Sequence, residues 1–172
     1  MAKPVLMKRC MQCGSVLTDK YLASEGRRIP FCPSCGEFRF PVFNTAVSMI
    51  CTNEARDRIL LIRQYGGREC ILVAGYVNQG EDAEDAAVRE VREELGMDAL
   101  SVRFNRSHFF VPSNTLMLNF TVVLPDTDAA PNAEIDSWHW YSVDEARASI
   151  RRGSLAEAFL LGYLDHRYLF RK

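Results

Sequence analysis

The strongest signal in this sequence is the stretch from Gly75 to Met97, GYVNQGEDAEDAAVREVREELGM. Apolar residues recur in it at every fourth position, at Ala83, Ala87, Val91 and Leu95. This spacing predicts a helix over Glu84–Leu95 whose apolar stripe packs against a core. Asp82 stands where a helix N-cap belongs, and Gly96 stands where a glycine commonly ends a helix.

Carboxylates crowd one side of the predicted helix. At about 3.6 residues per turn, Glu90, Glu93 and Glu94 share an arc of about 100° beside the apolar stripe. Glu90 forms like-charge pairs with both others, each costing an isolated helix roughly 0.2–0.5 kcal/mol. A solvated acidic helix is the simpler interpretation, but it gains nothing from this crowding. A divalent cation such as Mg²⁺, which binds oxygen ligands and substrate phosphates, explains it better.

Cysteines form a second pattern near the N-terminus. Two matched CxxCG units, Cys10–Gly14 and Cys32–Gly36, leave eighteen residues between their inner cysteines. This is the spacing of a four-cysteine zinc site, with disulfides or redox-active pairs as the alternative. We expect a structural zinc ribbon, because four thiolates leave no open position on the ion. Cys51 and Cys70 adjoin apolar runs and are predicted to be buried.

The composition narrows the class of protein. The chain has 172 residues, and 48% of them are hydrophobic, which favours a packed core. Its net charge of −1 gives no global attraction to nucleic acid or anionic membranes. No apolar run approaches the ~18 residues of a membrane span, and the N-terminus lacks a signal peptide's apolar region. We therefore expect a cytoplasmic protein with no membrane partner. The neutral total conceals an acidic segment at 80–98 between mildly basic flanks.

From residue 44 onward, strand-like and helix-like segments alternate. We expect strands at Asn44–Cys51, Arg58–Gln64, Cys70–Val73, Val102–Ser107, Leu116–Leu124 and Trp138–Tyr141, and closing helices at Val143–Arg152 and Leu155–Leu169. Gly66-Gly67 marks a hairpin between the second and third strands. The pattern predicts an α/β fold, with a mixed sheet covered by helices and the cysteine module before it.

The stretch from Gly75 to Met97 resembles the Nudix box, G-x5-E-x7-R-E-U-x-E-E-x-G-U with U apolar, and matches all nine defined positions. The resemblance to Nudix hydrolases implies an α/β/α sandwich over residues 42–172, with the zinc ribbon at 1–41. It also implies hydrolysis of a nucleoside diphosphate linked to another group. Structural support of the box is expected from Gly75, Glu81, Arg89 and Gly96, with Glu81 paired to Arg89.

Features outside the box resemble the NADH pyrophosphatases, a Nudix subgroup that includes enzymes removing NAD caps from RNA. A four-cysteine ribbon precedes the box, and Ala74–Val77 resembles the subgroup's AGFV, whose aromatic residue stacks on nicotinamide. Glu134, six residues before Trp140, matches a glutamate that adds a metal ligand. Gly153–Ala156 resembles a small-residue segment that borders the substrate. Phe40, before a proline, matches an aromatic residue that reaches the partner subunit's site.

The resemblance implies a complete set of site residues. Mg²⁺ or Mn²⁺ is expected on the Ala74 carbonyl and on Glu90, Glu93, Glu94 and Glu134. Catalysis is assigned to Glu93, Glu94 and Glu134, with Glu93 orienting or deprotonating the attacking water. Structural Zn²⁺ is expected on Cys10, Cys13, Cys32 and Cys35. Substrate contacts are expected from Phe40, Tyr76, Thr115, Met117 and Ala156.

The expected function is metal-assisted hydrolysis of NADH or NAD to AMP and nicotinamide mononucleotide by a homodimer, with NAD-capped RNA as a further substrate. One segment departs from the subgroup: its hallmark SQPWPFPxS corresponds here to Ser107–Thr115, SHFFVPSNT, followed by Leu116 and Met117. ADP-ribose, FAD or another nucleoside diphosphate derivative therefore stays open as the substrate. A Nudix fold that serves as a ligand sensor or nucleic-acid-binding regulator is the alternative from another functional class.

Overall fold

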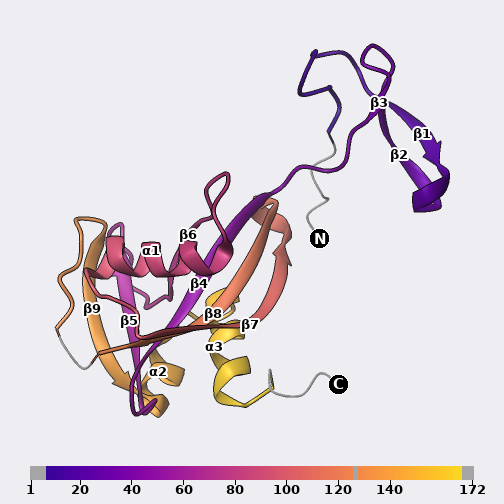
Figure 1. Cartoon of the computed structure of the whole chain (residues 1–172). Coiled ribbons are helices and arrows are strands. Elements are labelled where there is room, and N and C mark those ends of the chain that lie inside the picture. The colour runs from indigo at the N-terminus through magenta and orange to yellow at the C-terminus, as the bar shows by residue number, and fades with distance from the viewer. Residues whose placement is uncertain (1–6, 126–127, 168–172) are drawn as a thin grey trace. The chain divides into compact units, whose positions relative to one another are not determined.

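The computed structural model describes residues 7–125 and 128–167 (Figure 1). The chain divides into two compact units. The first comprises the chain up to Asn44 together with Val111–Asn114, and the second comprises Thr45–Phe110 and the chain from Thr115 onward. The expected domain boundary after residue 41 stays a prediction. No helix in the described ranges is long and apolar enough to cross a membrane.

The first unit is a small antiparallel sheet of β1 (Thr18–Leu22), β2 (Arg27–Cys32) and β3 (Glu37–Phe38). A 3-10 turn, η1 (Ala23–Glu25), and Gly26 at φ +63° connect the first two strands. The loop between the two CxxCG units thus forms the expected ribbon strands. Burial here is concentrated on Cys10, Ile29 and Cys32, so very little apolar packing supports this unit.

The second unit is built around one sheet with the strand order β7-β8-β4-β5-β9, and β6 pairs with β4 beside that path. Its strands are β4 (Asn44–Asn53), β5 (Arg58–Gln64), β6 (Val73–Tyr76), β7 (Ser101–Phe110), β8 (Thr115–Leu124) and β9 (Ile135–Ser142). The pairs β4–β5, β4–β6, β5–β9 and β7–β8 are antiparallel. The 3-10 turn η2 (Val111–Ser113) joins β7 to β8.

Helices cover both faces of this sheet (Figure 1). Met49 and Cys51 of β4 pack in a cluster with α1 (Ala83–Leu95), whereas Ile50 packs in a second cluster with α2 (Val143–Ser149) and α3 (Leu155–Leu164). Successive strand residues point to opposite faces, so a continuously apolar strand signals a sheet that is covered on both sides. The predicted α/β fold with helices on both faces is confirmed.

The structure corrects three predicted elements. The third strand is β6 rather than Cys70–Val73, because Val73 to Tyr76 pair along β4 while Cys70 and Ile71 form only isolated bridges. Helix α2 ends at Ser149 rather than Arg152, because Ile150 turns to an extended conformation and is buried. Helix α3 ends at Leu164, and the last residues of its predicted span lie outside the described ranges.

The predicted helix over the box is α1, which begins one residue earlier than expected. Asp82 has the extended backbone of an N-cap, but its side chain makes no capping hydrogen bond. Gly96 ends the helix at φ +64°, as its position predicted. Cys51 and Cys70 are both buried, which confirms that prediction.

Replacing Gly96 by alanine should cost more stability than replacing Gly80. Both glycines have positive φ, +64° and +83°, so alanine is strained at either position. Only at Gly96 would the new methyl meet another group, the Ala130 carbonyl oxygen at 2.7 Å. We expect Gly96→Ala to lower the free energy of unfolding by about 1–2 kcal/mol more than Gly80→Ala, as measured by urea denaturation. Equal losses would show that the contact does not matter.

Candidate functional site

Helix α1 carries the carboxylates of the box, and Arg89 is the centre of their hydrogen bonds. Its Nε and Nη2 donate to the two oxygens of Glu81 at 2.6 and 2.9 Å. Its Nη1 donates to Glu90 at 2.8 Å and to Glu93 at 3.0 Å. Nη2 also donates to the Tyr76 carbonyl at 2.9 Å. The Arg89 guanidinium thereby lowers the pKa of Glu81 to about 2, and the predicted ion pair between the two residues is present.

The Glu90 carboxyl group lies directly over Gly75. A Cβ at position 75 would meet the Glu90 Cδ at 1.9 Å, which no side chain tolerates. Gly75 lies within β6, where it pairs with Val47 of β4. The glycine of the box is therefore required because the carboxylate of the helix occupies the space of its missing side chain.

Glu94 is the most deeply buried carboxylate of the site, with 5% of the residue exposed. Its Oε2 is buried and has no hydrogen-bond partner among the described residues. Burial, followed by the charges of Glu90, Glu134 and Glu93, raises the pKa of Glu94 to about 7. A buried carboxylate oxygen without a partner is costly, unless a cation or a proton neutralises it.

The loop before β9 brings Glu134 toward Glu94. Two backbone bonds attach this loop to the end of α1, from the Ala130 N–H to the Leu95 carbonyl at 2.8 Å and from the Asn132 N–H to the Glu94 carbonyl at 3.0 Å. The Asn132 side-chain oxygen then accepts a hydrogen bond from the Glu134 N–H at 2.9 Å. The loop therefore also satisfies carbonyls that the helix leaves unpaired at its end.

Tyr65 is a residue of this site that the sequence analysis did not identify. Its hydroxyl donates to Glu134 Oε2 at 2.7 Å, and the charges of Glu134 and Glu94 add to the rise of its pKa. Tyr65 follows β5 directly, with φ at +55°, so the strand end aims it at the loop. An aromatic residue just before Gly66-Gly67 was the only available signal.

These features fit a hard divalent cation. Carboxylate oxygens are the ligands that Mg²⁺ and Mn²⁺ prefer, and the unpaired Glu94 oxygen lacks the partner that such an ion provides. Arg89 draws the carboxylates of Glu90 and Glu93 toward itself, so the set is looser than the cysteine cluster. Among the described residues, only the cysteines bring three or more candidate ligand atoms within 4.8 Å of one another.

The four cysteines of the first unit have the geometry that zinc requires. A tetrahedral ion with Zn–S bonds of ~2.3 Å places its sulfurs about 3.8 Å apart. Here Cys10 and Cys35 lie 3.9 Å apart at their sulfurs, and Cys13 and Cys32 lie 3.4 Å apart. All four are free cysteines, which disfavours the disulfide alternative.

Arg39 supports this cluster from outside. Its Nε donates to the Cys10 sulfur at 3.2 Å, and this bond is the main reason that the pKa of Cys10 falls to about 6. Its Nη2 donates to the side-chain oxygen of Gln12 at 2.8 Å. The guanidinium of Arg39, which follows β3 directly, is therefore held against the first CxxC turn. A cation beside a thiolate favours the ionised form that a metal binds.

The predicted substrate residues lie in different environments. Tyr76 is 58% exposed on β6, beside the glycine under Glu90. Met117 of β8 and Ala156 of α3 pack against the same apolar cluster, whereas Thr115 is buried where β8 begins. Phe40 belongs to the first unit and is 50% exposed. Stacking of a ring between Phe40 and Tyr76 stays a prediction, as do the substrate roles of the others.

The family model for the NUDIX domain matches residues 42–159. The chain belongs to the Nudix family. A Nudix hydrolase of known structure from Nitrosomonas europaea has the same fold, with a TM-score of 0.64, 21% identity, and alignment over 96% of this chain and 94% of that one.

Two Nudix relatives with curated names agree on one activity. The "NAD-capped RNA hydrolase NudC" of Stutzerimonas stutzeri is 30% identical over 92% of this chain and 56% of its own length. The protein of that name from Mycobacterium tuberculosis is 34% identical over 73% of this chain and 41% of its own length. This Nudix chain therefore spans about half the length of the curated relatives that it matches.

Without bound Mg²⁺ or Mn²⁺, the contribution of Glu94 to the stability of the protein should fall as pH rises. The folded state raises the pKa of Glu94 from about 4.5 to about 7, so it binds more protons than the unfolded chain between these values. The free energy of unfolding falls with rising pH wherever the folded state binds more protons than the unfolded chain. For Glu94 this fall amounts to on the order of 2–3 kcal/mol between pH 4.5 and 8. Glu94→Gln removes this loss, whereas Glu84→Gln, on the exposed side of the same helix, keeps it.

The measurement is thermal unfolding across this pH range in buffer with no divalent cation added. A chelator is omitted, because it would also remove zinc. Adding Mn²⁺ at pH 8 should raise the melting temperature of the wild type and of Glu84→Gln far more than that of Glu94→Gln. A Glu94→Gln profile that ran parallel to the wild type would contradict the assignment.

Arg39→Gln should weaken zinc retention without changing the four thiolates. Loss of the guanidinium makes the Cys10 thiolate less favourable, and losing a hydrogen bond to a metal ligand typically costs about 10–100-fold in metal affinity. Arg28→Gln is the matched control, because Arg28 is an exposed arginine of the same ribbon that donates to the Asp19 carbonyl. Zinc release to a chromogenic chelator measures the effect. Identical release from both variants would exclude this role for Arg39.

Proposed function

We propose that this chain hydrolyses the diphosphate bond of a dinucleotide with the help of Mg²⁺ or Mn²⁺. NADH or NAD is the proposed substrate, and AMP and nicotinamide mononucleotide are the products. One observation carries the proposal: the buried Glu94 carboxylate has an unpaired oxygen, and Glu90 and Glu134 lie close enough to raise its pKa. The names of the NudC relatives support the choice of an NAD-type substrate.

The proposed metal ligands are the Ala74 carbonyl and the carboxylates of Glu90, Glu93, Glu94 and Glu134. The bound ions would neutralise the diphosphate and lower the pKa of a bound water. Glu93, which is exposed on α1, would orient or deprotonate the attacking water. Arg89 and Glu81 fix the helix against the loop that precedes it, and Tyr65 holds Glu134. The oxygen of this water would bond to one phosphorus of the diphosphate, and the bond from that phosphorus to the bridging oxygen would break, which releases the two mononucleotides.

The four cysteines are proposed to hold one structural zinc ion. Four thiolates close the shell of the ion and leave no position for substrate, so the zinc supplies no chemistry to the reaction. It replaces the apolar core that this small unit lacks, because metal binding and folding are coupled in such modules. The protein is proposed to act as a homodimer, with Phe40 serving the partner's site.

NAD-capped RNA is the proposed larger substrate. Exposed basic residues of the ribbon, Arg9, Arg27 and Arg28, offer contacts to a phosphate backbone. Such contacts should weaken steeply with salt, whereas hydrolysis of the small dinucleotide should respond much less. The Ser107–Thr115 segment departs from the subgroup's hallmark, so the preferred dinucleotide must be measured.

Glu94→Gln should leave the fold intact and abolish most turnover. The substitution keeps the shape of the side chain and removes the charge that binds the cation, so we expect a loss of at least about 100-fold in kcat. Glu84→Gln is the matched control, because Glu84 is an exposed carboxylate in the first turn of the same helix. Circular dichroism and melting temperature check the fold of both variants. Near wild-type turnover by purified Glu94→Gln would contradict the assignment of Glu94 as a metal ligand.

A substrate panel identifies the dinucleotide. NADH, NAD, ADP-ribose, FAD, dinucleoside polyphosphates and NAD-capped RNA are incubated with Mg²⁺ or Mn²⁺, and products are resolved by chromatography. We expect the highest kcat/KM for NADH or NAD, with nicotinamide mononucleotide among the products. A preference for ADP-ribose would contradict the NAD assignment alone. Cleavage of no member would favour the sensor alternative instead.

A further inference from the structure

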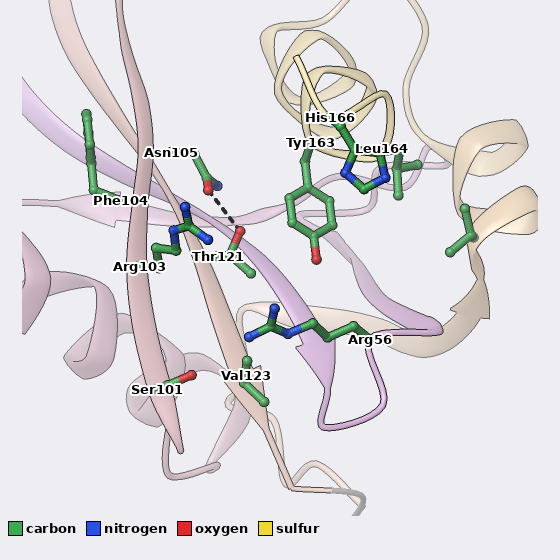
Figure 2. A pocket seen from close by; sticks show the side chains of 11 residues that line it. Arg56, Ser101, Arg103, Phe104, Asn105, Thr121, Val123, Tyr163, Leu164 and His166 are labelled. Atoms are coloured by element: carbon green, nitrogen blue, oxygen red, sulfur yellow. Dashed lines mark hydrogen bonds between the residues drawn. The ribbon is translucent and has the colours of Figure 1, made fainter. Parts of the chain in front are cut away.

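A cavity of about 390 Å³ lies on the face of the sheet that carries α3, between β7, β8 and the end of that helix (Figure 2). Its volume is within the range of about 300–1,000 Å³ that is typical of small-molecule sites. Arg56 enters from the turn between β4 and β5, Arg103 from β7, and Tyr163 from α3. All of its lining residues belong to the second unit.

This cavity is separate from the carboxylate site. Strand β5 runs between the two: Arg56 lies two residues before its first residue, and Tyr65, which holds Glu134, follows its last. Seven strand residues at about 3.3 Å each place these two residues roughly 20 Å apart. The two sites also differ in layer, because α1 covers the opposite face of the sheet from α3.

The cavity has a strongly positive character. The guanidinium groups of Arg56 and Arg103 line it, and no described carboxylate does. Within the described ranges neither Arg56 nor Arg103 has an ion pair, although most arginines of the helices and the ribbon have one. Figure 2 shows both guanidinium groups and the Tyr163 hydroxyl directed into the same space. The charges of these two arginines also act on the Tyr163 hydroxyl, opposing the rise in its pKa that burial causes.

Hydrogen bonds fix the turn that carries Arg56 and part of the cavity lining. The Arg56 backbone has φ at +58°, and its N–H donates to the Asn53 carbonyl in a tight turn. Thr121, which lines the cavity, is 7% exposed and donates to the Asn105 side-chain oxygen at 3.0 Å.

Apolar side chains also line the cavity beside the two arginines. Val123, Val143 and Leu164 line the cavity beside the Tyr163 ring. Two guanidinium groups with a hydroxyl suit a phosphate, because charge-assisted hydrogen bonds to its oxygens are short and strong. The apolar walls and the aromatic ring suit a flat organic group attached to that phosphate.

We propose that this cavity binds a phosphate monoester that carries a ring, such as a mononucleotide, at a site distinct from the carboxylate cluster. The phosphate lies between Arg56 and Arg103, and the ring lies along Tyr163 and Leu164. The proposal does not depend on the proposed hydrolysis. It requires only the described residues of the second unit.

Calorimetric titration with AMP in the absence of divalent cations tests the site. Under these conditions the carboxylate cluster repels a phosphate, so binding reports the cavity. We expect saturable binding of AMP and at least about tenfold weaker binding of uncharged adenosine. Arg56→Gln and Arg103→Gln, both exposed residues on different elements, should each weaken AMP binding by about tenfold or more. Arg151→Gln is the matched control, because Arg151 pairs with Glu69 on the surface.

Amide chemical shifts of the wild type locate the ligand. AMP should shift the signals of Ser101, Thr121 and Leu164, and leave those of Gly75 and Glu90 in place. Shifts confined to Gly75 and Glu90, equal affinity for AMP and adenosine, or affinity unchanged in both arginine variants would overturn the proposal. So would the absence of saturable binding. Each of these outcomes leaves the turnover test of Glu94→Gln unaffected, so the two proposals fail separately.

Discussion

The guanidinium of Arg89 is the interaction on which the arrangement of the metal-site residues depends. Clustered carboxylates repel one another, and Arg89 offsets this repulsion by bonding Glu81, Glu90 and Glu93 at once. Its fifth hydrogen bond, to the Tyr76 carbonyl, ties the helix to β6. A lysine would keep the charge but not the planar fork of donors. One side chain therefore sets the position of the helix, the loop before it and the strand beneath it.

The fold was largely predictable because its central elements have periodic patterns. The apolar stripe of α1 and the largely apolar run at residues 46–51 of β4 are both visible in the sequence. The ends of the helices and strands were less predictable where pairing between strands decided them. Val73 to Tyr76 extend as a strand because β4 offers them a partner, although Gly75 weakens the strand pattern. Ile150 leaves the helix because a bridge to Cys70 competes with it, which no local pattern reveals.

The candidate site was predictable to the extent that its residues are close in sequence. Glu90 and Glu94 follow from helical spacing, and the cysteines follow from their paired turns. Glu134 required a resemblance to a family, because its approach to Glu94 depends on loop bonds far along the chain. Tyr65 and the cavity between Arg56 and Arg103 were missed for the same reason: residues from distant segments meet there only after the sheet forms.

The backbone bonds between the loop of Glu134 and the last turn of α1 have a consequence for how this protein tolerates change. Ala130 and Asn132 are attached to the helix end itself, so Glu134 moves with the helix as part of one body. An insertion of one residue between Asn132 and Glu134 would uncouple the two. Homologous chains should therefore keep the spacing between this attachment and Glu134 fixed.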